Sequence, residues 1–313
     1  MCGFVGFIGS RGSALAPDEI LRAMTSRIMH RGPDGAGYWR DAEHGVALAH
    51  RRLAVLDLSP AGHQPMVSVC GRFVLVFNGE IYNHLDLRRE LETSGLASAW
   101  RGQSDTETLL ACFAHWGVKV SLQRSVGMFA LALWDRNTHE LMLARDRVGE
   151  KPLYYGQQGG VLLFGSELKA LRAHPSFGGA IDRQALSLFL RYGYIPAPFS
   201  IYQGIRKLKP GCLLRIREDG QVADQEIYWD SRDVLEQPRR LLSPRDETVW
   251  IDELEGLLKD AVAQQMLADV PLGAFLSGWV DSSLIVALMQ AQSKQPVKTF
   301  TIGFNERAYD ETE

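Results

Sequence analysis

Short apolar stretches separated by turn residues recur through the first two-thirds of the 313-residue chain. They read CGFVGFIG, GVALAHRRLAVLD, RFVLVFNGEIYN, MFALALWD, ELMLARD and GVLLFGSE. Apolar runs of this length, joined by turns, are typical of β-strands and indicate extensive sheet. Helical patterns lie between them at 18–29, 85–94 and 105–116, where apolar residues can share one helical face. This part of the chain is therefore predicted to be sheets packed with helices.

A different pattern follows residues 231–247, a charged segment with two prolines that suits an exposed connection. A helix is predicted at about 248–268. VPLGAFLSG, DSSLIVALMQAQ and VKTFTIGF then form strand, helix and strand, which is a βαβ unit of a parallel sheet. Because a parallel sheet needs several strands covered on both faces, the second domain is expected to be truncated. We predict domains at 1–230 and 248–313, joined by the connection at 231–247.

Composition restricts the classes of function. With 46% hydrophobic and 23% charged residues, the chain is typical of a soluble globular protein. A net charge of −3 gives no electrostatic reason to expect nucleic acid or an anionic membrane as partner, so small polar substrates fit better. The four cysteines are widely spaced without a CxxC pair and indicate neither a zinc site nor a disulfide framework. Without a signal segment or membrane span, a cytoplasmic location is expected.

The N-terminus carries the clearest candidate for a catalytic residue. If Met1 is removed, Cys2 holds a thiol beside a free α-amino group. An α-amino group has an ordinary pKa of about 7.7–8.0, so it can accept the thiol proton and later return it to a leaving amine such as ammonia. The alternative is that Cys2 is a small buried apolar residue.

Six motifs occur in order: MCGFVGFIG, HRGPDGAG, HRRLAVLD, FNGEIYN, QSDTE and RDRVGEKPLYY. Together they resemble class II glutamine amidotransferases of the asparagine synthetase type, over residues 1 to about 230. VPLGAFLSGWVDSS is similar to the pyrophosphate-binding SGGxDS loop of the same family's synthetase domain. The resemblance implies an α+β N-terminal-nucleophile sandwich (αββα), with two antiparallel sheets between helical layers, that hydrolyses glutamine. It also implies that the start of an α/β adenylating domain of the PP-loop ATPase type follows.

The resemblance assigns the reacting groups. Cys2 would be the nucleophile, and the Asn78 side chain with the backbone N–H of Gly79 would form the oxyanion hole and contact the substrate. A side-chain amide and a glycine N–H are two preorganised donors at low steric cost, which suits a tetrahedral oxyanion. Taken alone, however, Asn-Gly is the usual dipeptide of a hairpin turn, and that alternative stays open.

The resemblance also assigns the groups that would bind free glutamine. Arg52 would bind its α-carboxylate, and Glu80 and Asp105 its α-ammonium, as charge-assisted pairs. Without the family context, each of the three is a surface charge. The RDRVGEKPLYY segment and three further residues are predicted to be structural or supporting, not catalytic: His30, Arg31 and His50.

In the second domain, the resemblance implies a site for ATP and pyrophosphate with Mg²⁺ at Asp281. Its residues would be Leu276, Ser277, Gly278, Asp281, Ser282, Ser283 and Ile302, with Leu276 and Ile302 on the adenine side. The alternative is that the serines only cap a helix and Leu276 only packs in a core. Trp279 stands where the family has its second glycine. If that position requires a positive φ, tryptophan is expected to strain the loop, and its indole is expected to obstruct phosphate.

The predicted function is that of a glutamine-hydrolysing asparagine synthetase, of which this chain retains the glutaminase half. Glutamine, aspartate and ATP are the expected partners, nucleic acid and membrane are not, and a homodimer is left open. One rival is an amidotransferase for another acceptor. The SGWVDSS loop argues against aminosugar phosphate or phosphoribosylamine synthesis, because those acceptors need no adenylation. The rival from another class is a truncated noncatalytic remnant or binding module.

Overall fold

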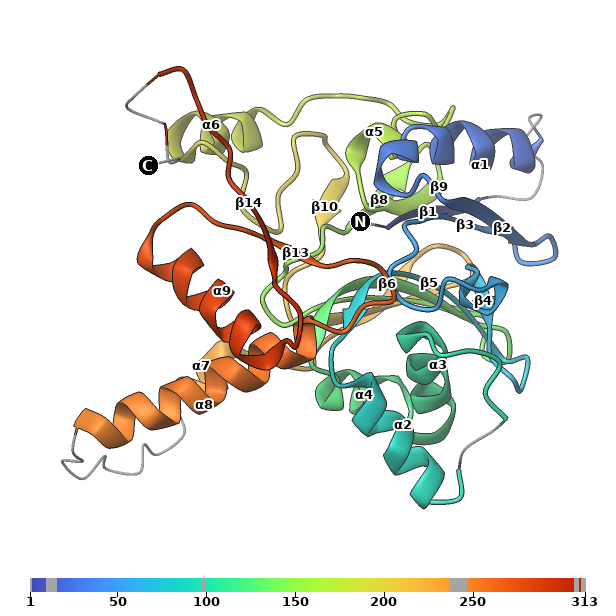
Figure 1. Ribbon diagram of the computed structural model, residues 1–313. Coiled ribbons are helices and arrows are strands. Elements are labelled where there is room, and N and C mark those ends of the chain that lie inside the picture. Colours follow the sequence, from blue (N-terminus) through green and yellow to red (C-terminus); the bar gives the residue numbers. More distant parts are fainter. Residues whose placement is uncertain (1, 10–15, 97–98, 237–246, 307–309, 311–313) are drawn as a thin grey trace. The chain divides into compact units, whose positions relative to one another are not determined.

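The computed structural model describes residues 2–9, 16–96, 99–236, 247–306 and 310 (Figure 1). Contacts divide the chain into two compact units, Met1–Val234 and Leu235–Glu313. The predicted connection begins with helix α7 (Ser231–Glu236), and its continuation at 237–246 lies outside the described residues.

Unit 1 contains two six-stranded sheets. The first has the spatial order β10 (Ile205–Lys207), β8 (Tyr154–Gln158), β9 (Val161–Gly165), β1 (Gly3–Ile8), β3 (Val46–Arg52) and β2 (Gly35–Asp41). The second has the order β12 (Val222–Ile227), β11 (Cys212–Arg217), β7 (Glu140–Arg145), β6 (Gly127–Asp135), β5 (Phe73–Ile81) and β4 (Met66–Val67). All strand pairs that the structure describes in these sheets are antiparallel, as predicted.

Helices cover the outer face of each sheet. Helices α1 (Pro17–Ser26) and α5 (Leu168–Leu171) pack on the first sheet through one apolar cluster. Helices α2 (His84–Thr93), α3 (Asp105–Trp116) and α4 (Val118–Arg124) pack on the second sheet through another. A third cluster lies between the two sheets. The order of layers is helix, sheet, sheet, helix, which is the predicted αββα sandwich (Figure 1).

Strand β5 is buried on both faces, which explains why its sequence is apolar without strict alternation. Side chains alternate between the two faces of a strand. Phe73, Leu75 and Phe77 belong to the cluster under the helices, whereas Val74 and Val76 belong to the cluster between the sheets. Because both faces are buried, an alternating polar residue would lie in a core, and FVLVF is uniformly apolar.

The predicted helices of unit 1 agree closely with the structure. The pattern at 105–116 is helix α3, and those at 18–29 and 85–94 are α1 and α2 with shifted ends. Ser104 caps α3 by accepting a hydrogen bond from the Glu107 N–H, so part of QSDTE is a helix-capping sequence. The structure also describes α6 (Arg183–Tyr192) and the short 3₁₀ helices η1 (Met29–Arg31) and η2 (Pro60–Gly62) in this unit.

Unit 2 contains helix α8 (Glu247–Gln265) and the predicted βαβ unit: β13 (Gly273–Phe275), α9 (Val280–Gln292) and β14 (Lys298–Phe300). The two strands pair in parallel. Its small core is formed by Val262 of α8 with Leu288 and Met289 of α9. Among the helices described in either unit, none combines the length and the apolarity needed to cross a membrane.

Candidate active site

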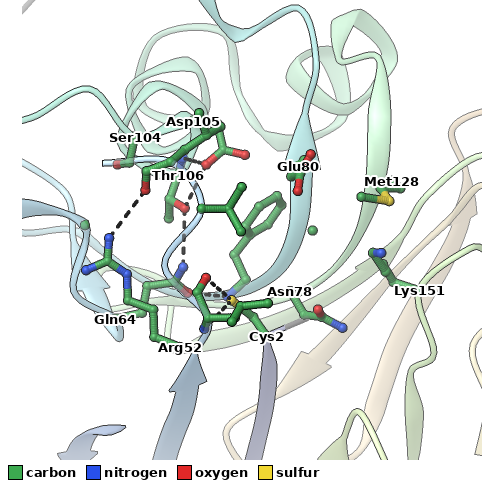
Figure 2. A pocket seen from close by; sticks show the side chains of 16 residues that line it. Cys2, Arg52, Gln64, Asn78, Glu80, Ser104, Asp105, Thr106, Met128 and Lys151 are labelled. Atoms are coloured by element: carbon green, nitrogen blue, oxygen red, sulfur yellow. Dashed lines mark hydrogen bonds between the residues drawn. The ribbon is translucent and has the colours of Figure 1, made fainter. Parts of the chain in front are cut away.

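The site residues predicted in the first domain come together around one cavity of about 90 Å³ at one end of the sandwich (Figure 2). Cys2 precedes β1, and Arg52 ends β3 in the same sheet. The opposite sheet supplies three consecutive residues near the end of β5, and α3 supplies its first residue. The predicted residues that line the cavity are Cys2, Arg52, Asn78, Gly79, Glu80 and Asp105.

The Cys2 thiol is held by the backbone of Leu53. It donates to the Leu53 carbonyl at 3.4 Å and accepts from the Leu53 N–H at 3.3 Å. Burial raises the pKa of the Cys2 thiol, although the Leu53 bond partly opposes the shift. The thiol is therefore protonated at neutral pH and needs a base to become a nucleophile. None of the residues described around the cavity is a histidine.

Arg31 fixes the backbone of Cys2. Its Nε–H donates to the Cys2 carbonyl at 2.8 Å, and its Nη1 pairs with Glu167 at 3.0 Å. A Cβ at Gly3 would lie 2.8 Å from the Arg31 side chain, so glycine at this position admits the arginine. His30 also contacts Glu167 and remains more than half exposed. This geometry supports the prediction that the HRGPD segment holds the site and does not itself react.

Asn78 and Gly79 lie within strand β5, opposite Ala130 and Phe129 of β6. The alternative of a hairpin turn at this Asn-Gly pair is therefore wrong. Alternation along β5 directs the Asn78 side chain to the face between the sheets, the same face as Val76. There it is almost fully buried, and both its Nδ2 and its Oδ1 lack a hydrogen-bond partner in the described structure. A buried side-chain amide without a partner is costly and is suited to a ligand that supplies one.

The Gly79 N–H is directed away from β6. The neighbouring N–H groups on the same edge of β5 donate to side chains. The Phe77 N–H donates to Gln64 Oε1 at 2.7 Å, and the Ile81 N–H donates to Asp105 Oδ2 at 2.9 Å. Because N–H groups alternate between strand edges, the Gly79 N–H lies between these two and faces the same side. A Cβ at Gly79 would lie 2.1 Å from the Met128 carbonyl oxygen, so close strand pairing requires glycine here.

Arg52 supplies positive charge to the cavity. Its guanidinium donates to the carbonyls of Ser59 at 3.0 Å, Leu56 at 3.4 Å and Asp57. These bonds order the loop after β3 and use about three of the five guanidinium N–H groups. Carbonyl oxygens do not neutralise the charge, so an anionic group can still bind the remaining donors.

Two carboxyl groups face the same cavity. Asp105 accepts hydrogen bonds from the N–H groups of Ile81 at 2.9 Å and Thr106 at 2.7 Å, but burial raises its pKa nonetheless. The pKa of Glu80 is also raised, first by burial and then by the charge of Asp105. Two carboxylates that repel one another are stabilised by a cation placed between them.

The nucleotide loop predicted in unit 2 joins β13 to α9. Gly278 has a φ of +78°, and the hydroxyls of Ser277 and Ser282 are 2.9 Å apart, which closes the loop. Trp279 has a φ of −80° and precedes α9. The expected backbone strain at Trp279 is therefore absent, because the left-handed residue of this loop is the glycine before it. Its side chain is 68% exposed.

The other predicted residues of the nucleotide site lie around this loop. Asp281 and Ser283 are exposed in the first turn of α9. The Leu276 N–H bonds to the Phe300 carbonyl at 2.9 Å, so Leu276 extends the pairing of β13 with β14. Ile302 lies beyond the end of β14 and is exposed. The structure thus brings the predicted residues to the carboxyl ends of adjacent parallel strands, where open α/β sheets bind ligands.

Comparison with protein families gives one match over residues 1–229, to a glutamine amidotransferase domain, and a second over 253–313, to asparagine synthase. The chain belongs to the glutamine amidotransferase domain family. Two asparagine synthetases [glutamine-hydrolyzing] of Bacillus subtilis, numbered 1 and 3, are 35% and 34% identical to it over 100% and 98% of this chain. A Gibberella zeae protein named an amidase is 33% identical over 95% of this chain.

The chain spans about half the length of these relatives, 47% and 48% of the two synthetases and 44% of the amidase. Among solved structures, the glutamine phosphoribosylpyrophosphate amidotransferase of Bacillus subtilis is similar to this amidotransferase chain, with a TM-score of 0.55 and 19% identity. That similarity covers 97% of this chain and 67% of the other. At this identity it supports the fold alone.

Some residues of the amidotransferase site were not found from the sequence. Lys151 lines the cavity and is buried, and burial lowers its pKa while Glu80 opposes the shift. It lies in RDRVGEKPLYY, which was predicted to be structural. Asp146 supports that prediction for the rest of the motif, because its carboxylate accepts backbone N–H groups from Val148 to Lys151. Gln64 and Thr106 also line the cavity and bond to one another at 3.3 Å. No spacing in the sequence distinguishes these residues from structural ones.

Proposed function

We propose that this chain hydrolyses glutamine at Cys2 and forms part of a glutamine-dependent asparagine synthetase. The observation that carries the proposal is the buried Asn78 amide without a partner, in the cavity that also contains the Cys2 thiol and the Arg52 guanidinium. The family match over residues 1–229 supports the same activity.

The first step is activation of the thiol. Removal of Met1 exposes the α-amino group of Cys2, whose ordinary pKa of about 7.7–8.0 makes it a base at neutral pH. Because the pKa of the thiol is raised by burial, transfer of its proton to this amine is a necessary step. The thiolate sulfur then attacks the amide carbon of glutamine, and a carbon–sulfur bond forms as the carbonyl becomes an oxyanion.

The oxyanion is stabilised by two donors. In the described structure the Asn78 Nδ2 is buried without a partner on the face of β5 between the sheets, and the Gly79 N–H is directed away from β6. Each donor is fixed before the reaction, so no reorganisation is needed as charge develops. When the intermediate collapses, the protonated amine of Cys2 returns its proton to the leaving nitrogen and ammonia departs. Water then hydrolyses the thioester to glutamate and regenerates the thiol.

Glutamine is recognised by its charged α-carboxylate and α-ammonium groups. Its α-carboxylate pairs with the donors of Arg52 that the loop carbonyls leave available. Its α-ammonium is placed between Glu80 and Asp105, where its charge offsets the burial and, second to it, the repulsion from Asp105 that raise the pKa of Glu80. Charge-assisted pairs of this kind select a free amino acid over an uncharged amide.

In the synthetase half, ATP and Mg²⁺ fit the residues of the β13–α9 loop. Ser277, Gly278, Ser282 and Ser283 offer hydroxyl and N–H groups to phosphate, and the Asp281 carboxylate is the type of ligand that Mg²⁺ prefers. Leu276 and Ile302 would contact the adenine. When bound, Mg²⁺ would neutralise pyrophosphate charge. Aspartate would be the acceptor that ATP activates and ammonia attacks, and the naming of two Bacillus relatives as asparagine synthetases supports this choice of product.

The acceptor is the part of this proposal that has a rival. The relative named an amidase is similar over almost the same share of this chain, so the glutaminase half by itself is compatible with another acceptor. A homodimer and a cytoplasmic location stay predictions.

The test is release of ammonia and glutamate, in equal amounts, from glutamine by the purified 313-residue chain. Cys2→Ala should reduce both to background, because thiol and amine act as a unit. Intact-mass measurement should show that Met1 is absent from active protein. Full turnover by protein that retains Met1, or by Cys2→Ala, would disprove the mechanism.

A further inference from the structure

Two histidines and a glutamate meet at the end of the sandwich away from Cys2. His44 Nε2 lies 3.7 Å from Glu218 Oε2, and His139 Nδ1 lies 4.0 Å from the same oxygen. Their ligand atoms all lie within 4.8 Å of one another. Two imidazoles and a carboxylate are a ligand set that binds Zn²⁺ and similar ions, with a water completing a four-coordinate site.

The position of this cluster follows from topology. His44 lies in the β2–β3 turn of the first sheet, and His139 and Glu218 lie in the β6–β7 and β11–β12 turns of the second. Strand β3 runs from the β2–β3 turn to Arg52. Strand β6 runs from the region of Met128 to the β6–β7 turn. Arg52 and Met128 both line the Cys2 cavity. The cluster therefore joins hairpin tips of both sheets at the end opposite the Cys2 cavity.

His44 is oriented as a metal ligand would be. Its Nδ1 contacts Asp41 Oδ2 at 3.0 Å, which leaves Nε2 directed at Glu218. A carboxylate that accepts from the second ring nitrogen is the usual partner of a metal-bound histidine.

The second imidazole is held by ring contacts. The His139 ring lies 3.9 Å from the His44 ring between centroids, and it stacks on Trp134 at 6.4 Å with an interplanar angle of 15°. Ligand atoms around a tetrahedral ion with bonds of about 2.0–2.1 Å lie roughly 3.3 Å apart. The observed separations from Glu218 thus need to shorten by less than about 1 Å.

Nearby arginines do not exclude a cation. Arg40, Arg72 and Arg136 line the same hollow as His44 and His139. Arg40 pairs with Asp18 at 2.8 Å and Arg72 with Asp135 at 2.6 Å, so both charges are offset. Arg136 bonds to the Gly71 carbonyl at 3.0 Å and keeps its charge, but two carboxylates, Asp41 and Glu218, lie against the histidines.

We propose that His44 Nε2, His139 Nδ1 and the Glu218 carboxylate bind one divalent transition-metal ion such as Zn²⁺. The ion links the two sheets at the end of the sandwich that lacks the catalytic cavity. Its role is structural: it stabilises the amidotransferase unit and takes no part in glutamine hydrolysis. Without an ion, the three groups would form only partly exposed ion pairs of little energetic value.

The test uses the metal-free 313-residue chain, titrated with Co²⁺ by absorption and with Zn²⁺ by chelator competition. Wild type should bind one equivalent with visible d–d bands and no thiolate-to-cobalt charge transfer. Asp41→Asn should weaken binding by about 10–100-fold, and the ligand variants His139→Asn and Glu218→Gln by more. Asparagine suits position 139 because φ there is +55°.

His115→Asn is the matched control, because His115 is exposed on α3 outside the cluster. It should bind the ion as wild type does. Zn²⁺ should raise the melting temperature of wild type and of this control but not that of His139→Asn, and glutamine hydrolysis should be equal in all of them. Unchanged binding in both ligand variants, a thiolate charge-transfer band, or no stoichiometric binding by wild type would each overturn the proposal.

Discussion

Replacement of Asn78 by leucine should lower activity and raise stability together. Asn78 Nδ2 and Oδ1 are both buried without a hydrogen-bond partner in the described structure, and leucine has the same branching at Cγ without polar atoms. Loss of one oxyanion-hole donor typically lowers kcat by about 10²–10³, or roughly 2.7–4 kcal/mol. Removal of an unpaired buried polar group relieves a desolvation cost of about 1–3 kcal/mol. For a unit of this size, that corresponds to a rise in melting temperature of roughly 2–12 °C.

The assay pairs steady-state ammonia release with thermal unfolding. Asn83→Leu is the control, since the Asn83 side chain donates to the Arg124 carbonyl at 3.0 Å and accepts from the Val126 N–H at 2.9 Å. It should lower the melting temperature, because those partners are left unpaired, and should leave kcat unchanged. If Asn78→Leu destabilises the protein and retains kcat within about threefold, the Asn78 amide is structural and the reasoning fails.

Three further predictions concern pH, positioning and the nucleotide loop. The raised pKa of Glu80 makes the native state hold more protons than the unfolded state, so stability should fall as pH rises above the ordinary glutamate pKa of 4.5. Glu80→Gln should reduce that fall, measured as melting temperature against pH. An identical pH series in both proteins would contradict this. Arg31→Lys removes the charged hydrogen bond to the Cys2 carbonyl and should lower kcat by roughly tenfold or more with KM little changed; a rise in KM alone would instead place Arg31 in substrate binding. Trp279→Gly should change the free energy of unfolding by less than about 1 kcal/mol, measured by urea denaturation, because φ at 279 is already negative; a larger stabilisation would show strain that the backbone does not have.

The local sequence pattern was sufficient to predict individual helices and strands. The helix at 105–116 and the βαβ unit were predicted because their apolar periodicity and their flanking turn residues act over a few residues. The motif order was sufficient for the family, and it named the residues that line the cavity. Those roles came from resemblance, since nothing in the local sequence separates Arg52 from a surface arginine.

Local pattern misled at Asn78-Gly79. This dipeptide is a turn former because glycine tolerates positive φ, but here glycine is required for close approach to the Met128 carbonyl across the strand pair. Local sequence was also insufficient at Trp279, because its backbone conformation depends on which residue of the loop takes the positive φ, and that residue is Gly278. Two different physical demands select the same residue type, and a single sequence does not say which one acts.

Apolar periodicity, a property of contiguous residues, by itself determined the strands and helices. The layers and the antiparallel sheets followed from the family that the ordered motifs resemble, and the chemistry of Cys2 stays a prediction from the same resemblance. Only the tertiary structure decided that Lys151 joins the cavity and that His44, His139 and Glu218 meet at the other end. Those residues lie on separate hairpins or loops, and their distances are set by strand register and by the packing of one sheet on the other. Such separations depend on every pairing between them, so they are a property of the folded chain and not of any segment of it.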